Sequence, residues 1–483
     1  MSNRKSNQKS GETNQAIDAG AEPHLRRALG VWGAAAFVVT SMIGTGIFTV
    51  PAFVRVAAGN GVSALGVWMV GAMLALFGAF CYAELATRMP KAGGEYQYLS
   101  NVYGRPWGFV GGWITFFAGF AAPTAASSIA AVEYFSHLTP WWDRNTPLLP
   151  NLGTGITQGS AIAALLPLSL AFAHSLGVRL SGRLQITLAA ITVGAIVIFT
   201  ATGFASGRGD FGGVIGGSNT TWKWWSALIP VGFAYSGWNA AAYLAGEVTE
   251  PRRNLPRALI WGTLSVAVLY IALNLLYFFA LPADSWQAVV SVGNEAAERL
   301  FGESGGKLVS AIIMFLILGA ISAWTASGPR IYYAMACDGL APSIFKRLGQ
   351  RSQAPIIAIF TQAIIASIMA LNSAFGALVL YVGSGVMLIS MLTVAAVYFV
   401  RRTSPADSKL YFSVPGYPFT PAIYILLVIL SWIQTLRNDP KPPIAALITI
   451  IAGLGVYYIG RAWGWIAISS KTQLEIKTPE SNL

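Results

Sequence analysis

Apolar stretches long enough to cross a membrane recur along almost the whole chain, separated by short polar or Gly- and Pro-containing connections. A helix of about 20 apolar residues crosses the roughly 30 Å of bilayer hydrocarbon. The pattern therefore predicts an all-α integral membrane protein with about 12 transmembrane helices. The expected spans are residues 31–54, 62–86, 107–135, 159–175, 184–205, 224–246, 257–281, 307–328, 355–373, 376–400, 417–436 and 443–464.

Two of these spans are interrupted by residues that weaken a helix. The first span, 31–54, contains Gly-Thr-Gly at 44–46, and the sixth, 224–246, contains a Pro, two Gly and a Ser within 230–237. In lipid, every backbone N–H and C=O needs a partner. The interruptions thus predict two broken helices whose freed groups are met by protein, water or a bound solute. The alternative is that the small residues only let helices approach closely.

The two interruptions stand five spans apart, at matching positions of two halves. With an odd number of spans in each half, the second half enters the membrane from the opposite side, which is typical of inverted-repeat transporters. We expect a first five-helix repeat at 29–206, a second at 222–402, two further helices at 415–465, and tails at 1–28 and 466–483. Two unrelated helix kinks are the alternative.

Broken helices offer main-chain atoms to a solute. A half-helix that starts after Gly46 exposes N–H groups and a positive dipole end, which suit a carboxylate. Half-helices that stop before each interruption expose C=O groups, which suit an ammonium. An α-amino acid carries both groups, so the pattern favours a zwitterionic substrate.

Composition and charge agree with a membrane location. Of 483 residues, 55% are hydrophobic and 10% charged, whereas a soluble protein carries about 25% charged residues. The net charge of +12 needs no nucleic acid to explain it. With the N-terminus in the cytoplasm, 23 of the 31 Lys and Arg fall on the cytoplasmic side, as the positive-inside rule requires. We expect both termini in the cytoplasm and a location in a bacterial inner (plasma) membrane.

Motifs for other kinds of chemistry are missing from the sequence. It contains no phosphate-binding Gly-x-x-x-x-Gly-Lys-Ser/Thr loop, no Gly-x-Ser-x-Gly elbow and no zinc-protease motif. The three His show no metal-ligand spacing, and two Cys make no disulfide framework. We therefore expect neither ATP-driven transport nor an enzyme, no metal and no cofactor, apart from a coupling ion, Na⁺ or H⁺, whose identity is open.

Five segments carry a family resemblance. They are Ser41–Phe48 with the following Pro51, Cys81–Tyr96, Phe233–Asn239, Gly246–Pro256 and Ser327–Pro342. With them the chain, from about Leu29 to Trp465, resembles the amino acid–polyamine–organocation (APC) superfamily, and within it the permeases similar to L-type amino-acid transporters. The resemblance implies a five-plus-five inverted repeat and alternating access around a central amino-acid site.

The resemblance also implies roles for single residues. Four positions would hold the substrate carboxylate through backbone N–H groups, and five others would receive its amino group. Phe233 would be an aromatic gate above the substrate, and Asn239 a polar contact near its side chain. The carboxylate set is Ile43, Gly44, Thr45 and Gly46, and the amino-group set is Ser41, Met42, Phe233, Ala234 and Ser236.

One position departs from the family pattern. Many relatives carry a lysine in the fifth span, where this chain has Thr192. Proton coupling through that lysine is therefore not expected, while Na⁺ coupling, exchange and facilitated uptake stay open.

Three acidic residues near span ends also require an interpretation. Glu133, near the outer end of the third span, is a candidate for selectivity or coupling, or else sits at the headgroup level and faces water. Glu84 and Glu247 lie beside Arg88 and Arg252 and are expected to pair with them.

These observations predict a secondary transporter that moves neutral amino acids across a lipid bilayer. A transporter of cationic amino acids or polyamines is the alternative that rests on Glu133. A transporter-like amino-acid sensor is an alternative of a different class, although tails of this length leave little room for a signalling domain. The substrate's side chain and the oligomeric state stay open.

Overall fold

The computed structural model describes residues 27–466, except 92, 149, 151–154, 177–181, 217–221, 284, 287–289, 350–353 and 404–410. Most of the predicted N-terminal tail and the predicted C-terminal tail lie outside these residues. Within them the chain is helical and forms no strand, only two isolated bridges.

Eighteen α-helices make up the described chain. They are α1 (Val31–Met42), α2 (Thr45–Ala58), α3 (Gly61–Arg88), α4 (Glu95–Tyr103), α5 (Arg105–Ile114), α6 (Ala122–Leu138), α7 (Gln158–Ser175), α8 (Gly182–Ala205), α9 (Gly212–Ile215), α10 (Leu228–Ala234), α11 (Ala240–Tyr243), α12 (Pro251–Ala280), α13 (Val292–Phe301), α14 (Glu303–Cys337), α15 (Ile356–Asn372), α16 (Phe375–Thr403), α17 (Phe419–Asn438) and α18 (Lys441–Ala462). A π-helical stretch, Thr115–Ala121, joins α5 to α6 in one long span.

The predicted fold class is confirmed. In the described chain, eight helical spans are long and apolar enough to cross a membrane, and α1 with α2 makes a ninth, bent by 45°. The other three predicted spans coincide with α7, with α15 of 17 residues, and with the short helices α10 and α11. Each of the twelve predicted apolar stretches is therefore helical.

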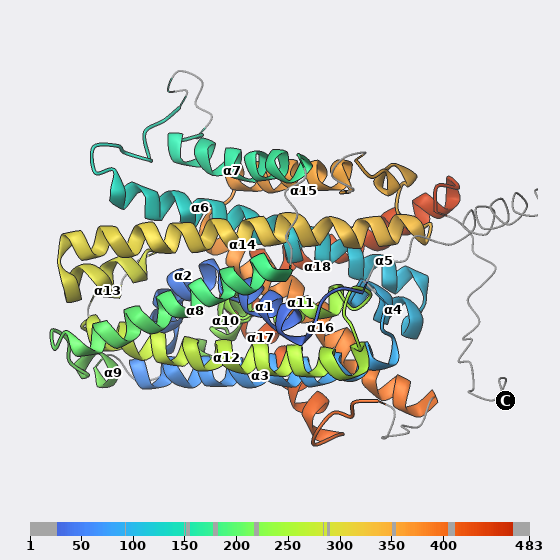
Figure 1. Cartoon of the computed structure of the whole chain (residues 1–483), viewed down its shortest axis with the longest axis horizontal. Helices are drawn as coiled ribbons and strands as arrows, with labels where there is room; N and C mark the ends of the chain where they lie inside the picture. Colours follow the sequence, from blue (N-terminus) through green and yellow to red (C-terminus); the bar gives the residue numbers. More distant parts are fainter. Residues whose placement is uncertain are drawn as a thin grey trace, which may run out of the picture.

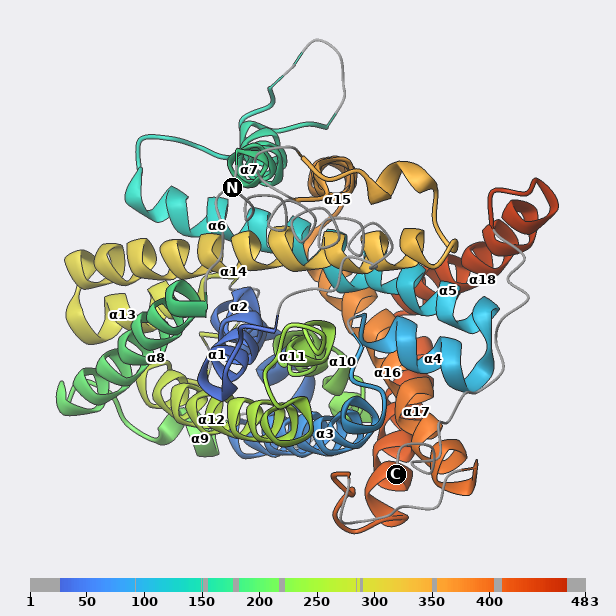
Figure 2. The ribbon, with the colours of Figure 1, turned by 45° about the vertical axis from the view of Figure 1, so that its right-hand side comes forward.

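The four helices of the two interrupted spans lie at the centre of the bundle. Figures 1 and 2 show α1, α2, α10 and α11 in the middle, with α3 and α12 on one side and α14 and α6 on the other. Helices α7 and α15 pack against each other beyond α6. The broken segments thus lie inside protein, where non-helical backbone at membrane depth is tolerated.

Small residues let α3 approach the central helices. A Cβ added at Gly71 would overlap Val231, and one at Gly78 would lie 2.6 Å from the ring of Trp238. Helix α8 shows the opposite pattern, since only 22% of its span is buried and Ile198 is 64% exposed. Its apolar side chains face outward, which is the arrangement expected for a helix at the lipid boundary.

One buried carboxylate ties three segments together at one end of the bundle. Glu84 of α3 pairs with Arg88 at 3.0 Å and with Arg401 of α16 at 2.5 Å. It also accepts a hydrogen bond of 2.8 Å from the Val414 N–H. The predicted pairing with Arg88 is confirmed, and the two further partners stabilise a carboxylate that is almost fully buried.

The predicted partner of Glu247 is wrong. Glu247 pairs with Arg330 of α14 at 3.5 Å, while the guanidinium of Arg252 lies 5.1 Å from the ring centroid of Tyr411. The physical reason is backbone pairing, because the N–H of Leu29 donates to the Glu247 carbonyl at 3.0 Å. This contact fixes the segment after α11 beside the start of α1, and from there the Glu247 carboxylate reaches Arg330.

Candidate functional site

The first broken span ends α1 at Met42 and restarts as α2 at Thr45; residues 43–44 between them are called the first break. The N–H of Ile43 still donates to the Val39 carbonyl at 2.9 Å, and the N–H of Gly44 donates to the Met42 carbonyl at 3.0 Å. Helix α2 has no side chain that caps its first turn. Its first N–H groups, from Thr45 onward, therefore remain for a ligand, and they carry the positive end of the helix dipole.

The second broken span ends α10 at Ala234 and restarts as α11 at Ala240; residues 235–239 between them are called the second break. Gly237 has a φ of +98°, a conformation that L side chains rarely adopt. The hydroxyl and the N–H of Ser236 both donate to the Phe233 carbonyl, at 2.7 and 3.0 Å. The span is thus interrupted where the Gly-rich sequence predicts, although its two helices are very short.

A glycine on each broken span makes room for the other span. An added Cβ at Gly46 would lie 2.8 Å from the Cβ of Ala234 and closer still to its Cα. An added Cβ at Gly237 would lie 2.6 Å from the Ser41 carbonyl oxygen. The order of these contacts is reversed between the two spans, since 41 meets 237 and 46 meets 234. The broken spans therefore lie antiparallel and in direct backbone contact.

Tyr270 of α12 links the C-terminal ends of α1 and α10. Its hydroxyl lies 2.6 Å from the Met42 carbonyl oxygen and 3.0 Å from the Ala234 carbonyl oxygen. These two carbonyls are among those expected to receive an amino group, and in the structure both lie within hydrogen-bond distance of the Tyr270 hydroxyl. Sequence reasoning missed Tyr270, because nothing in a regular apolar span marks one tyrosine as the partner of two helix ends.

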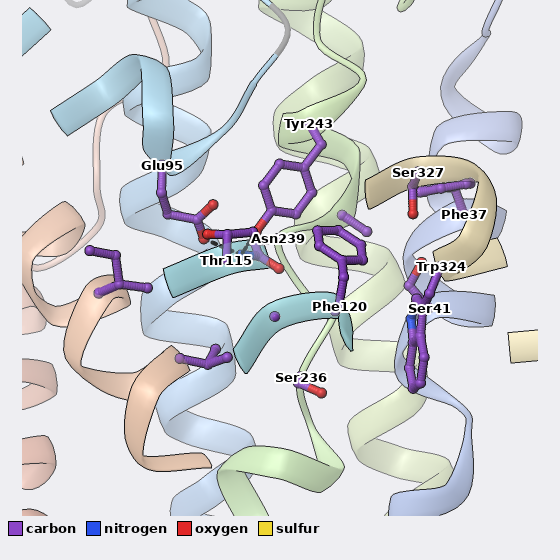
Figure 3. A pocket seen from close by; sticks show the side chains of 15 residues that line it. Phe37, Ser41, Glu95, Thr115, Phe120, Ser236, Asn239, Tyr243, Trp324 and Ser327 are labelled. Carbon is purple, nitrogen blue, oxygen red and sulfur yellow. Dashed lines mark hydrogen bonds between the residues drawn. The ribbon is translucent and has the colours of Figure 1, made fainter. Parts of the chain in front are cut away.

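A small polar cavity lies beside both breaks. Its polar side chains are those of Ser41, Glu95, Thr115, Ser236, Asn239 and Ser327, and its aromatic ones those of Phe37, Phe120, Tyr243 and Trp324. Figure 3 shows Ser41 and Trp324 on one side of it and Glu95 with Asn239 on the other. Thr115, Gly119 and Phe120 belong to the π-helical stretch, an irregularity that is frequent at functional sites. We call this space the polar cavity.

The polar cavity contains some of the predicted site residues and not others. Ser41, Ser236 and Asn239 line it. Met42, Gly44, Thr45, Gly46, Phe233 and Ala234 belong to the two broken spans but do not line it. The Phe233 side chain, predicted to be a gate, is 3% exposed and packed in the core. Ile43 and Thr192 line a separate small cavity between α1, α8 and α14.

Comparison with known proteins identifies the chain. The amino acid permease family matches residues 29–454. The chain belongs to this family of the APC superfamily. The permease is 30% identical to the serine/threonine exchanger SteT of Bacillus subtilis (strain 168) over 444 residues, which cover 90% of this chain and 97% of that protein.

Animal transporters are similar over the same length. The large neutral amino acids transporter small subunit 2 of Mus musculus is 26% identical over 93% of this chain and 84% of its own length. The Asc-type amino acid transporter 1 of Mus musculus is 24% identical over 91% of this chain and 82% of its own. The permease is thus an integral membrane protein and a secondary amino-acid transporter.

The structure places Glu133 of the permease away from the polar cavity. Glu133 lies on α6, is 9% exposed and pairs with Arg144 in the following loop. This ion pair compensates its charge, so Glu133 does not offer a free carboxylate to a substrate in the described structure. A carboxylate that faces water, the alternative for Glu133, does not describe a side chain that is this well covered by protein.

Glu95 is the carboxylate that does line the polar cavity, and sequence reasoning gave it no role. It begins α4, is 1% exposed and accepts a hydrogen bond of 2.9 Å from the Tyr82 hydroxyl. The side-chain amide of Asn239 also donates to it. The signal was present in the Gly93-Gly94-Glu95-Tyr96 segment, where an acidic residue follows two glycines. Both glycines have positive φ and turn the chain so that Glu95 points inward.

The described residues of the permease contain no group of three or more His, Cys, Asp or Glu that would hold a metal ion. The candidate site comprises main-chain groups at two helix breaks and the side chains of the polar cavity. Hydrogen-bonding groups of this kind bind a zwitterion without covalent chemistry.

Proposed function

We propose that the permease exchanges small neutral amino acids by alternating access around its two breaks. The observation that carries this proposal is the direct antiparallel contact between the breaks, through Gly46 with Ala234 and Gly237 with Ser41. A pair of broken helices packed in this way gives one site a positive helix start and carbonyl-rich helix ends. Family membership makes the solute an amino acid.

The first turn of α2 is the proposed carboxylate site. The N–H groups of Thr45 and Gly46 belong to this turn, which has no side-chain cap. Gly46 has no side chain to cover its own N–H, so a carboxylate can approach closely. Ile43 and Gly44 shape this approach, while their N–H groups bond within the chain.

The amino group is proposed to lie toward Ser41 and Ser236. The Ser41 hydroxyl is buried, lines the polar cavity and has no hydrogen-bond partner in the described structure. Because Tyr270 occupies the Met42 and Ala234 carbonyls, an ammonium group competes with its hydroxyl there. Phe233 stays the proposed gate, and its side chain must then leave the core when the site opens.

The lining of the polar cavity supports a small, uncharged substrate side chain. Its volume of about 40 Å³ holds about three or four waters, since each needs roughly 10–15 Å³ of such space. Hydroxyl and amide groups from Thr115, Asn239 and Ser327 are suited to water or a short polar side chain. The names of similar proteins, a serine/threonine exchanger and large neutral amino-acid transporters, support the same choice.

The alternatives have less support. A cationic or polyamine substrate rested on Glu133, which is paired with Arg144. A sensor would bind amino acids without moving them, and an enzyme would need a catalytic group that the sequence motifs do not supply.

The proposal also covers how the permease is arranged in the membrane. It includes two inverted five-helix repeats at 29–206 and 222–402, both termini in the cytoplasm, and a bacterial inner membrane. The excess of Lys and Arg on one side supports this orientation. Thr192 has no titratable group in its cavity, so a coupling proton would have to bind elsewhere, while Na⁺ coupling stays open.

Counterflow in proteoliposomes tests the proposed function. Vesicles are loaded with a mixed amino-acid pool, and labelled serine, leucine, lysine and putrescine are supplied outside, with and without Na⁺ and pH gradients. We expect labelled serine to accumulate only in loaded vesicles. Binding without counterflow would support the sensor, and uptake of lysine or putrescine alone would support the cationic alternative.

A further inference from the structure

Glu95 is a buried carboxylate without a compensating cation. None of the ion pairs formed by the described residues includes it. The titratable groups that face it are phenols, namely Tyr82 of α3, Tyr98 of α4, Tyr243 of α11 and Tyr424 of α17. A buried carboxylate with neutral neighbours is stabilised by neutralisation more than by any of these hydrogen bonds.

The two oxygens of Glu95 have different surroundings. Oε1 accepts from the Tyr82 hydroxyl and from the Asn239 amide. Oε2 is buried and accepts neither of these two hydrogen bonds, and the Tyr243 phenol is the further donor that faces the carboxylate. Glu95 lines the polar cavity, and Figure 3 shows its carboxyl end turned toward Asn239 and Tyr243. Oε1 is therefore held by two donors, and Oε2, beside the Tyr243 phenol, is the oxygen that can take up a proton.

We propose that Glu95 is a proton-binding site of the transport cycle. Its Oε2 carries a proton while the polar cavity is closed, and releases it when the cavity opens to water. The proton comes from a hydronium ion of the aqueous phase on the Glu95 side: one O–H bond forms at Oε2 as one O–H bond of the hydronium breaks and leaves water. This inference rests on the proposed function, since it adds a proton step to the same alternating site.

The location of Glu95 connects this proton to the moving parts. Through Asn239 it holds the second break, through Tyr82 it holds α3, and as the first residue of α4 it holds the adjoining loop. Burial raises the pKa of the Glu95 carboxyl above its usual value, and hydrogen bonds from Tyr243, Tyr82 and Asn239 lower it by less. The dipole of α4 favours the anion, but desolvation is the larger effect for a group this buried.

Exchange measured against pH tests the proposal. Proteoliposomes with wild type and Glu95→Gln exchange labelled serine while the pH on the Glu95 side is raised from mildly acidic to mildly alkaline. The protonated form closes the cavity, so the wild-type rate should fall, approaching tenfold per pH unit above the raised pKa. Glu95→Gln should be independent of pH, because its amide imitates the protonated acid. Glu303→Gln is the matched control, since Glu303 is exposed and pairs with Lys307, and it should keep the wild-type profile.

A spectroscopic measurement covers the case in which Glu95→Gln does not fold. The infrared difference spectrum of wild-type protein, recorded as the pH is raised, should show loss of the carbonyl band of a protonated carboxylic acid. Glu95→Asp should keep a titrating band at a shifted pH. A wild-type spectrum without this band, or a flat wild-type rate profile, overturns the proposal.

Other cations would give different results. Exchange of lysine or arginine that Glu95→Gln abolishes would mean that the carboxylate binds a cationic substrate, and Na⁺ stimulation lost in this variant would mean that it binds Na⁺. Either result overturns the proton site. Failure of the proposed function is distinguishable, because wild type would then exchange no amino acid although the infrared band still titrates.

Discussion

Replacing Gly46 by alanine tests whether contact between the two breaks is needed for transport. The new Cβ would lie 2.8 Å from the Ala234 Cβ, whereas carbon atoms prefer separations of about 3.5–4.0 Å. The Ala234 Cα would be closer still, so the two spans must move apart by roughly 1–1.5 Å. Overpacking of a tight core costs about 1–3 kcal/mol. If this cost falls on the state in which the breaks touch, its population drops by about 5- to 150-fold.

The assay is the initial rate of serine counterflow per molecule of protein in the vesicle membrane. We expect Gly46→Ala to insert normally and to exchange at least about fivefold more slowly than wild type. Gly455→Ala on α18 is the control, since its added Cβ meets no atom of the described chain within 4 Å. A Gly46→Ala protein that exchanges at the wild-type rate would refute the reasoning that the spans must touch at this glycine.

Three further substitutions test other parts of the structure. Tyr270→Phe removes the donor shared by two helix ends. It should lower the midpoint of thermal unfolding, at a cost of about 1–3 kcal/mol, because the Ala234 carbonyl loses its side-chain donor and the Met42 carbonyl keeps only the Gly44 N–H within the described chain; an unchanged midpoint would contradict this. Glu84→Gln weakens a buried network with Arg401. It should lower the free energy of unfolding by at most about 3–5 kcal/mol, the cost of losing such a pair, as measured by thermal unfolding in detergent; stability equal to wild type would count against it. Glu133→Gln leaves Arg144 without its partner but should spare serine exchange, so complete loss of counterflow would place Glu133 in coupling or gating.

Local sequence predicted the helices and the places where two of them break. Runs of apolar residues are sufficient to locate a helix in lipid, because each helix satisfies its own backbone. Gly44, Gly46 and Gly237 stand where the structure departs from a regular helix or where two backbones approach. These features depend on residues close in sequence, so they could be predicted from the sequence.

Contacts between distant segments could not be predicted from the sequence. Tyr270 reaches both breaks, and Glu95 reaches the second break, only because the bundle brings α12 and α4 beside α10 and α11. Glu247 pairs with Arg330, which lies far from it in sequence, instead of with the neighbouring Arg252. No periodicity marks such partners. The set of residues around the polar cavity could therefore be predicted only in part.

The most direct measurement is an experimental structure of the permease with a neutral amino acid bound. The account predicts density for the amino acid between the first and second breaks, with its carboxylate at the N–H groups of Thr45 and Gly46 and its side chain toward Asn239. Density at another place, or a bound amino acid whose carboxylate contacts only side chains, would contradict the central claim that main-chain groups of two broken helices form the site.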